Sequence, residues 1–140
     1  MKISTHGRYG LRLLIELVLI DSNEYIPLSD LAKRTGISLN YLESIIKPLK
    51  IAGILDSSGG SSGGYRMIRS PNDLSVYEVL SVLEGNFLHN STESTDAMPY
   101  RDFLNQAVWN MLDDAVVDYL RSVSIQTLVD QAIRLTESHK

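Results

Sequence analysis

The stretch PLSDLAKRTGISLNYLESIIKPLKIAGIL, residues 27–55, predicts two short helices joined by a tight turn. Ser29 can cap the first helix. Gly36 can end it, because glycine readily adopts the left-handed conformation that often follows a helix. Ser38 can cap the second helix, since its hydroxyl can accept hydrogen bonds from free N–H groups of the first turn. Pro48 should bend or end that helix, because proline removes one backbone hydrogen bond.

The second helix of this pair has two different faces. Its apolar residues recur at helical spacing and predict a buried face made of Leu42, Ile45, Ile46 and Leu49. The opposite face is polar and carries Asn40, Tyr41, Glu43, Ser44 and Lys47. Such a face is typical of a helix that lies in a DNA major groove. The alternative is an ordinary helical hairpin whose polar face is simply solvated.

Residues 54–68, ILDSSGGSSGGYRMI, predict a β-hairpin with a glycine-serine tip. A hairpin that follows a helix–turn–helix is a wing. The alternative is a flexible linker, which is disfavoured because the ordered pattern Tyr-Arg-Met-Ile resumes directly after the glycines. A helix then follows over residues 75–84, and Gly85 ends it.

The C-terminal part predicts a long helix from Tyr100 to about Ser122 and a last helix capped by Ser124. The long helix is apolar around most of its girth, so it needs cover from several directions. In a chain this small, a second copy is the natural cover, because a lone helical hairpin would leave an apolar patch exposed. The expected dimer interface consists of Phe103, Val108, Met111, Leu112, Ala115, Val116 and Tyr119.

The charge is divided unevenly along the 140 residues. The whole chain has a net charge of −4, but residues 1–70 hold nine Lys/Arg and six Asp/Glu, a net +3. Residues 71–140 hold four Lys/Arg and eleven Asp/Glu, a net −7. A basic lobe with a helix–turn–helix, joined to an acidic lobe, suits a DNA reader with a separate assembly or sensing part.

Several functional classes are disfavoured by composition. The chain has no cysteine, which removes disulfides, thiol nucleophiles and thiolate-held metal sites. No apolar run reaches the roughly 18–20 residues that span a membrane, and no signal peptide is expected, so a cytoplasmic location is predicted. The histidines are scattered at His6, His89 and His139, without catalytic or metal-ligand spacing, so we do not expect an enzyme.

Four segments together resemble the Rrf-two family of bacterial winged-helix regulators: MKISTHGRYGLRLL, GISLNYLESIIKPLKIAGIL, GGYRM and LSVYEVLSVLEG. The resemblance implies a homodimer whose long helices cross and whose recognition helices enter adjacent major grooves. It also implies a mainly α fold, with a winged helix-turn-helix DNA-binding domain over residues 1–85, a mobile loop over 86–99 and dimerisation helices over 100–140.

Carried over from this resemblance, the base-reading positions are Ser38, Asn40, Tyr41, Glu43 and Ser44. Contacts to the DNA backbone and minor groove are expected from Arg8, Lys47, Ser58, Gly59, Gly60, Ser61, Ser62 and Gly63. Chemistry agrees, because Glu accepts a hydrogen bond from cytosine and Asn can pair with adenine. The wing lacks the arginine found in many members, so its sequence discrimination should be weaker.

A second departure from the family pattern concerns the loop in which some members hold a sensing cluster. Members that bind an iron–sulfur cluster carry three cysteines in the loop that here spans residues 86–99, and this loop has none. Only His89 with Glu93 or Asp96 could substitute, which is a weak signal. The chain therefore looks most like the cysteine metabolism repressor branch, whose members sense through the enzyme O-acetylserine (thiol)-lyase. We expect no bound cofactor.

The predicted function is a dimeric transcriptional regulator, most simply a repressor, that binds a palindromic operator and controls sulfur or cysteine metabolism. The alternative is a winged-helix protein-interaction module with little DNA affinity, in which the acidic lobe and the loop dock a partner.

Overall fold

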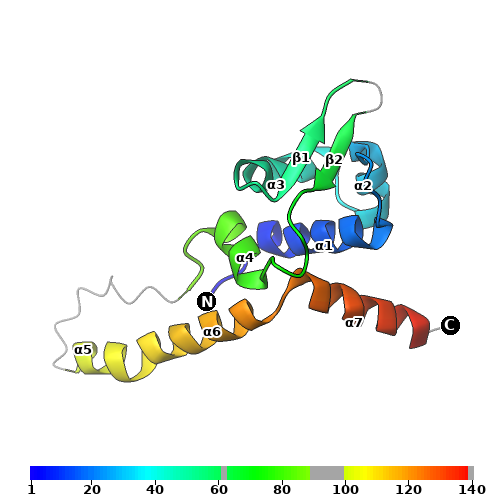
Figure 1. The fold of residues 1–140 in the computed structure, drawn as a ribbon. Helices are drawn as coiled ribbons and strands as arrows, with labels where there is room; N and C mark the ends of the chain where they lie inside the picture. The colour runs from blue at the N-terminus through cyan, green and yellow to red at the C-terminus, as the bar shows by residue number, and fades with distance from the viewer. Residues whose placement is uncertain (61–62, 89–99, 139–140) are drawn as a thin grey trace.

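The computed structural model describes residues 1–60, 63–88 and 100–138 (Figure 1). The elements follow one another as helices α1 Thr5–Ile20, α2 Leu28–Thr35 and α3 Leu39–Ile51, strands β1 Leu55–Ser58 and β2 Gly64–Met67, then helix α4 Val76–Glu84. A long helical arm follows, made of α5 Arg101–Leu104, the π segment Asn105–Trp109 and α6 Asn110–Ser122, and the chain ends in α7 Ile125–Ser138. The mainly α winged-helix fold class is confirmed.

The helix–turn–helix forms where the sequence predicts it, with two local corrections. Gly36 ends α2 with φ 73°, and the hydroxyl oxygen of Ser38 accepts a hydrogen bond from the backbone N–H of Tyr41 at 3.3 Å, as predicted. Ser29 is not a cap: α2 begins directly after Pro27, which pre-sets the backbone for a first turn, and Ser29 lies inside it. Nor does α3 end at Pro48, because the helix continues to Ile51.

The start of α1 is held by a side-chain cap. Ser4 is the N-cap, with its hydroxyl oxygen accepting from the N–H of His6 at 3.2 Å. Glu84 at the end of α4 also binds this terminus, because its Oε1 accepts from the Ser4 and Gly7 backbone N–H groups. The helices α1 and α4 are therefore fastened at one corner of the winged helix.

The wing is a two-stranded antiparallel hairpin in which Leu55 pairs with Met67 and Ser58 with Gly64. A third segment joins it, because Ile26 and Tyr65 exchange two backbone hydrogen bonds of 2.8 and 2.9 Å. Gly64 is required at this crossing, since a Cβ there would collide with the backbone of Ile26 and Pro27. The wing is thus fixed at its base to the segment that precedes α2.

One core holds the winged helix together, and α7 contributes to it. The four predicted apolar residues of α3 are all buried there, with Leu13, Leu14, Leu31 and Val79 from the other helices. From α7, Ile125 and Val129 are 0% and 2% exposed, and the helix packs against α1. Ser124 caps α7 as predicted, since its hydroxyl oxygen accepts from the Thr127 N–H at 3.1 Å. Phe87, within the predicted loop, is buried as well.

The helical arm α5–α6 projects from this body (Figure 1). The predicted single helix runs without a break from Arg101 to Ser122, and the π segment is a wider turn within it. None of its residues is buried, although α6 touches α4 near the body. None of the helices in the described ranges is both long enough and apolar enough to cross a lipid bilayer.

Candidate nucleic-acid interface

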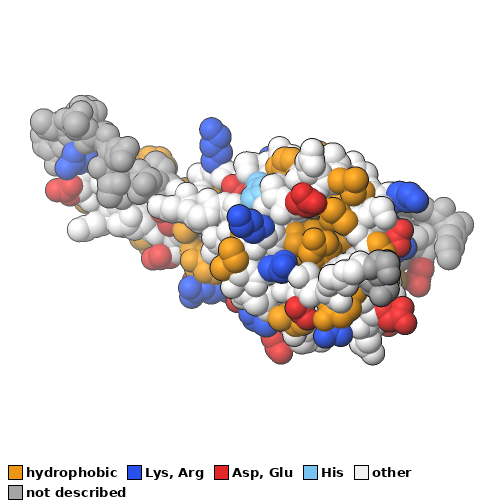
Figure 2. Space-filling model, turned by 90° about the horizontal axis from the view of Figure 1, so that it is seen from above, with side chains coloured by type: hydrophobic (Ala, Val, Ile, Leu, Met, Phe, Trp, Pro, Cys, Tyr) orange, Lys and Arg blue, Asp and Glu red, His pale blue; other side chains and the backbone are white. Residues whose placement is uncertain are grey.

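The outward face of α3 offers free polar groups near the N-terminus of the helix. Asn40, Glu43 and Lys47 are exposed, and within the described part of the chain their side chains form no hydrogen bond or ion pair. Such a face can exchange hydrogen bonds with base edges without first breaking internal ones. Figure 2 views this side of the molecule from above, where basic and acidic side chains surround an apolar area.

The other three predicted base readers are partly engaged within the protein. The hydroxyl oxygen of Ser38 caps α3, and Ser44 Oγ donates to the carbonyl oxygen of Tyr41 at 2.6 Å. The ring of Tyr41 is half-buried and lies edge-on to the rings of His6 and Tyr9, with centroid distances of 6.0 and 5.4 Å. Tyr41 therefore combines a solvent-accessible portion with a packing contact that positions the start of α3 against α1.

A shallow groove separates the second half of α3 from the wing. It is lined by Glu43, Ile46, Lys47, Lys50, Ile51 and Tyr65. The predicted site includes Lys47 but not Lys50. Spacing of three and four residues along the helix from Glu43 leads to Lys47 and then to Lys50, so the helical period is the signal that could have identified the second lysine. Leu39, which is 48% exposed at the first turn, was also missed.

The tip of the wing is open to solvent where the structure describes it. Ser58, Gly59 and Gly60 are exposed and Gly63 is half-buried, while the predicted contacts Ser61 and Ser62 lie outside the described residues. The Gly63 N–H donates to the Gly60 carbonyl oxygen at 3.1 Å, and Gly60 has φ 87°. No side chain at Gly59 or Gly60 blocks the approach of a phosphate backbone to this turn.

Two arginines lie near the start of α1, and the structure distinguishes their roles. Arg8 is exposed and has no side-chain partner among the described residues, so its charge is available for a phosphate. Arg12 donates to the Thr35 carbonyl oxygen at 3.3 Å, and its guanidinium lies 4.8 Å from the centre of the Tyr9 ring. Arg12 therefore supports the contact between α1 and the end of α2.

The wing is held at the correct angle by a polar cluster at its base. The Tyr25 hydroxyl donates to Asp56 Oδ2 at 2.8 Å, and Arg66 lies 3.7 Å from the same oxygen and 4.4 Å from the centre of the Tyr25 ring. The hydrogen bond from Tyr25, together with that from the Ser57 N–H, lowers the pKa of Asp56. The same bond raises the pKa of Tyr25, because the phenol is stabilised in its protonated, donating form.

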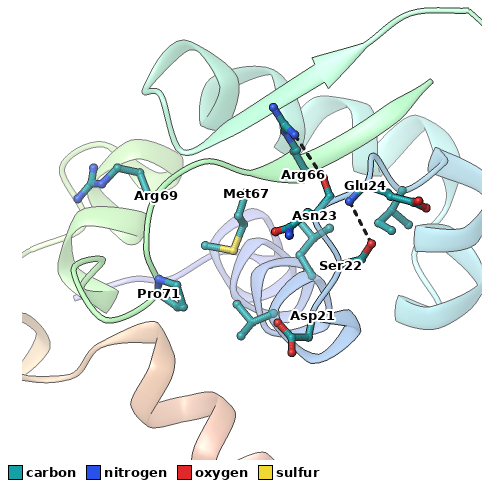
Figure 3. Close-up of a pocket in the computed structure, with 11 residues that line it drawn as sticks. Asp21, Ser22, Asn23, Glu24, Arg66, Met67, Arg69 and Pro71 are labelled. Atoms are coloured by element: carbon teal, nitrogen blue, oxygen red, sulfur yellow. Dashed lines mark hydrogen bonds between the residues drawn. The ribbon is translucent and has the colours of Figure 1, made fainter. Parts of the chain in front are cut away.

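A pocket lies below this cluster, between the end of α1 and strand β2 (Figure 3). Two arginines line it, and both already have partners. Arg66 Nη1 donates to the Asn23 carbonyl oxygen at 3.2 Å, whereas Arg69 forms bonds of 2.9 and 3.0 Å with the two carboxylate oxygens of Glu78. Those bonds to Glu78 raise the pKa of Arg69. The pocket is therefore a junction between the wing and its neighbours, with its two cations already paired.

The seven residues predicted for the dimer interface all lie on the helical arm, and none is buried within one chain. The exposed fractions are 66% for Phe103, 64% for Met111, 50% for Leu112 and 68% for Tyr119. Val108 is 41% exposed, Ala115 is exposed and Val116 is half-buried. This density of large apolar side chains on one projecting arm exceeds what isolated surface residues would produce.

The family model described as iron-dependent transcriptional regulator, Rrf2, matches residues 3–131. The chain belongs to the Rrf2 family. Among Rrf2 regulators, it is 31% identical to CymR of Bacillus subtilis over 128 residues, which cover 91% of this chain and 89% of CymR. It is 28% identical to IscR of Pectobacterium carotovorum over 131 residues, which cover 93% of this chain and 80% of IscR. The resemblance read from the sequence is thereby confirmed.

Solved structures of Rrf2 regulators share the whole architecture. The global cysteine regulator CymR of B. subtilis superposes with a TM-score of 0.78 at 30% identity, covering 94% of this chain and 98% of that one. CymR of Staphylococcus aureus gives a TM-score of 0.74 at 33% identity, over 92% and 96% of the two chains. The protein is therefore a DNA-binding transcriptional regulator of the winged-helix Rrf2 type.

The Rrf2 description implies iron, and the donor atoms of this chain do not fit a thiolate-held cluster. The full sequence contains no cysteine. Within residues 1–60, 63–88 and 100–138, no three His, Asp or Glu side chains come together as metal ligands would. The suggested substitutes His89, Glu93 and Asp96 lie outside the described residues.

Proposed function

We propose that this protein is a homodimeric repressor that reads an imperfect palindrome, with α3 in the major groove and the wing on the DNA backbone. The supporting observation is the free polar face of α3 beside an open wing tip. Asn40, Glu43 and Lys47 have no internal partner in the described chain, while the apolar side of the same helix is fully buried. The helix is therefore held on its buried side, while these three polar side chains of its outward side point to solvent.

The residues divide into those that read bases and those that hold phosphates. Ser38 caps α3, and Asn40, Tyr41, Glu43 and Ser44 lie in its first two turns, the part of a recognition helix that reaches base edges. Glu43 selects cytosine by accepting from its amino group, and Asn40 selects adenine. Arg8, Lys47 and the wing residues Ser58–Gly63 bind the backbone and fix the register, without carrying sequence information.

A second copy of the chain completes the reader. The exposed apolar residues of the arm, from Phe103 to Tyr119, provide the surface that a two-fold partner would cover. Pairing through the arm doubles the modest positive charge of the N-terminal half. It also places two recognition helices on half-sites about 34–36 Å apart, one turn of DNA.

Regulation is proposed to arrive through a partner and not through a cluster. The chain has no cysteine, and its relative in B. subtilis is a global cysteine regulator. We therefore place the regulated genes in sulfur metabolism and the protein in the cytoplasm. A sensor enzyme such as O-acetylserine (thiol)-lyase would bind the dimer and change its affinity for DNA.

Selection of DNA from a random pool by the purified protein tests the proposal. We expect enrichment of a two-fold symmetric motif, bound as a dimer, with an affinity that falls as salt is added. A pool that remains unenriched, with equal affinity for all fragments, would refute operator reading and favour the protein-interaction alternative. Transcription from a selected promoter fragment, with and without the protein, then separates a repressor from an activator.

A further inference from the structure

The recognition helix contains one backbone acceptor that its own sequence leaves free. In an α-helix, the carbonyl oxygen of residue 44 accepts from the N–H of residue 48. Residue 48 is Pro48, which has no N–H, and α3 nevertheless continues to Ile51. Ser44 is exposed, so its carbonyl oxygen is open to a donor from outside α3.

A second free acceptor lies at the end of α4. The last four carbonyl oxygens of a helix have no partner within it. Leu83 is in the last turn of α4, and Gly85 ends the helix with φ 65°. The dipole of the helix makes this end negative, so a cation is favoured there.

His6 on α1 reaches both acceptors at once. Its Nδ1 lies 3.1 Å from the Leu83 carbonyl oxygen, and its Nε2 lies 3.1 Å from the Ser44 carbonyl oxygen. A neutral imidazole has one N–H and one lone pair, so it can donate to only one of two carbonyl oxygens. The imidazolium form has two N–H groups and can donate to both.

We propose that protonated His6 bridges α4 to the recognition helix and so positions α3 for DNA, which makes DNA affinity rise as the pH falls. The inference rests on the proposed DNA-reading function of α3. Loss of one ring proton leaves a lone pair facing one of the two carbonyl oxygens, so the imidazole no longer donates to both. The bridge from α4 to α3 beside Ser44, which belongs to the reading face, is then weakened.

The groups around His6 fit this role. On α4, the carboxylate of Glu84 accepts hydrogen bonds from the Ser4 and Gly7 N–H groups, on either side of His6 in the chain. On α3, the Tyr41 ring lies edge-on to the imidazole, so movement of His6 is passed to a second predicted base reader.

The neighbouring charges on α3 are Glu43 and Lys47, both exposed. On α1, His6 is followed by Gly7, the exposed Arg8 and then Tyr9, whose ring contacts Tyr41.

The test measures affinity for a selected operator fragment by fluorescence anisotropy, at constant ionic strength from about pH 5.5 to about pH 8, the range in which histidines titrate. A variant that carries both His89→Gln and His139→Gln keeps His6 as its sole histidine. We expect this variant and the wild type to bind about three- to tenfold more tightly at the acidic end, which corresponds to the net contribution of one intramolecular hydrogen bond. A flat profile for the sole-histidine variant would overturn the inference without any substitution at His6.

Two further variants separate positioning from a general effect of acid. His6→Gln cannot gain a proton, so its profile should be flat, and retention of the wild-type profile would overturn the inference. Pro48→Ala restores an N–H donor to the Ser44 carbonyl oxygen. The dependence of DNA affinity on pH should then shrink although His6 is intact. An unchanged dependence in this variant would also overturn the inference. If no DNA fragment is selected in the first place, the proposed function fails; a selected fragment with a flat profile rejects only the role of His6.

Discussion

Glu84 Oε1 accepts a hydrogen bond from the Gly7 N–H at 2.7 Å, which joins the end of α4 to the start of α1. The same oxygen accepts from the Ser4 N–H at 3.0 Å and from the Ser4 hydroxyl at 2.7 Å. One carboxylate thus satisfies two free N–H groups at a helix terminus whose dipole also favours negative charge. It lies one residue before Gly85, where α4 has to end.

The first prediction concerns this contact. Glu84→Gln removes the charge and weakens three hydrogen bonds, so the free energy of unfolding should fall by about 1–2 kcal/mol, as for the loss of a helix cap. Urea denaturation monitored by circular dichroism measures the change. Glu137→Gln, at an exposed position of α7, is the matched control and should leave the midpoint unchanged. Equal midpoints for both variants would mean that the Glu84 contact contributes no stability.

The second prediction compares two glycines of the hairpin. Gly64→Ala places a Cβ against the backbone of Ile26 and Pro27, so the crossing between the wing and this segment must separate. We expect a loss of about 2–3 kcal/mol in stability, in the range for overpacking in a tight site. Gly59→Ala meets no atom within 4 Å and should unfold like the wild type. Similar denaturation curves for the two variants would contradict the described register of the wing.

The third prediction follows the base of the wing with pH. The pKa of Asp56 is lowered by its hydrogen bond from Tyr25, so the carboxylate is favoured in the folded state. Its stabilising contribution is present above the ordinary value of 3.8 and is lost as the pH falls through the lower folded value. In Tyr25→Phe, the pKa of Asp56 should move upward toward 3.8, which a carboxyl carbon NMR titration measures. An Asp56 titration unaffected by this variant would show that the hydrogen bond does not form in solution.

The fourth prediction tests the proposed dimer. Met111→Asp places a charge on an apolar face of the arm, where the methionine is 64% exposed in one chain. A second copy could cover that charge only at a cost of several kcal/mol, so light scattering should report a monomer. Operator affinity should fall with it, because only one half-site is then bound. Asn110→Asp adds the same charge one residue earlier, at a polar position. Retained pairing in Met111→Asp would place the interface elsewhere.

The fifth prediction separates the recognition of bases from the electrostatic attraction to phosphates. Glu43→Ala should relax the preference at one base pair, which corresponds to about 1–3 kcal/mol of discrimination. Lys47→Ala should instead weaken binding to all sequences and lower the slope of log affinity against log salt by about one. Repeating the DNA selection with each variant measures the first effect, and titrations over a salt series measure the second. A Lys47 variant with altered base preference would reverse the assignment.

The sequence predicts the winged helix closely because its signals are local. Helix ends are set by residues that act within one turn of chain: Gly36, Ser38, Ser75 and Gly85. The helical spacing of the apolar residues determines which side of α3 is buried. The errors are also local. Pro48 is predicted to disturb α3, but tertiary packing holds the helix together, and His6 Nε2 lies 3.1 Å from the carbonyl oxygen that Pro48 leaves without a donor.

Contacts between distant segments could not be predicted in the same way. Nothing near Tyr25 in the sequence points to Asp56, and nothing near His6 points to Leu83, because each pair meets only after the helices have packed. The missing donor at Ser44 was readable from Pro48 alone, although the identity of its replacement was not. The DNA-reading residues remain a prediction that rests on the resemblance and on their exposure.

The π segment Asn105–Trp109 is a wider helical turn within the arm. A π turn contains one residue more than an α turn, as a single inserted residue would produce. The wider turn absorbs this extra residue, so the side chains before and after it, Phe103 and Met111 among them, keep the relative directions that an uninterrupted α-helix would give them. A residue can therefore be gained or lost at this point of the arm without turning the apolar side chains on which pairing would depend.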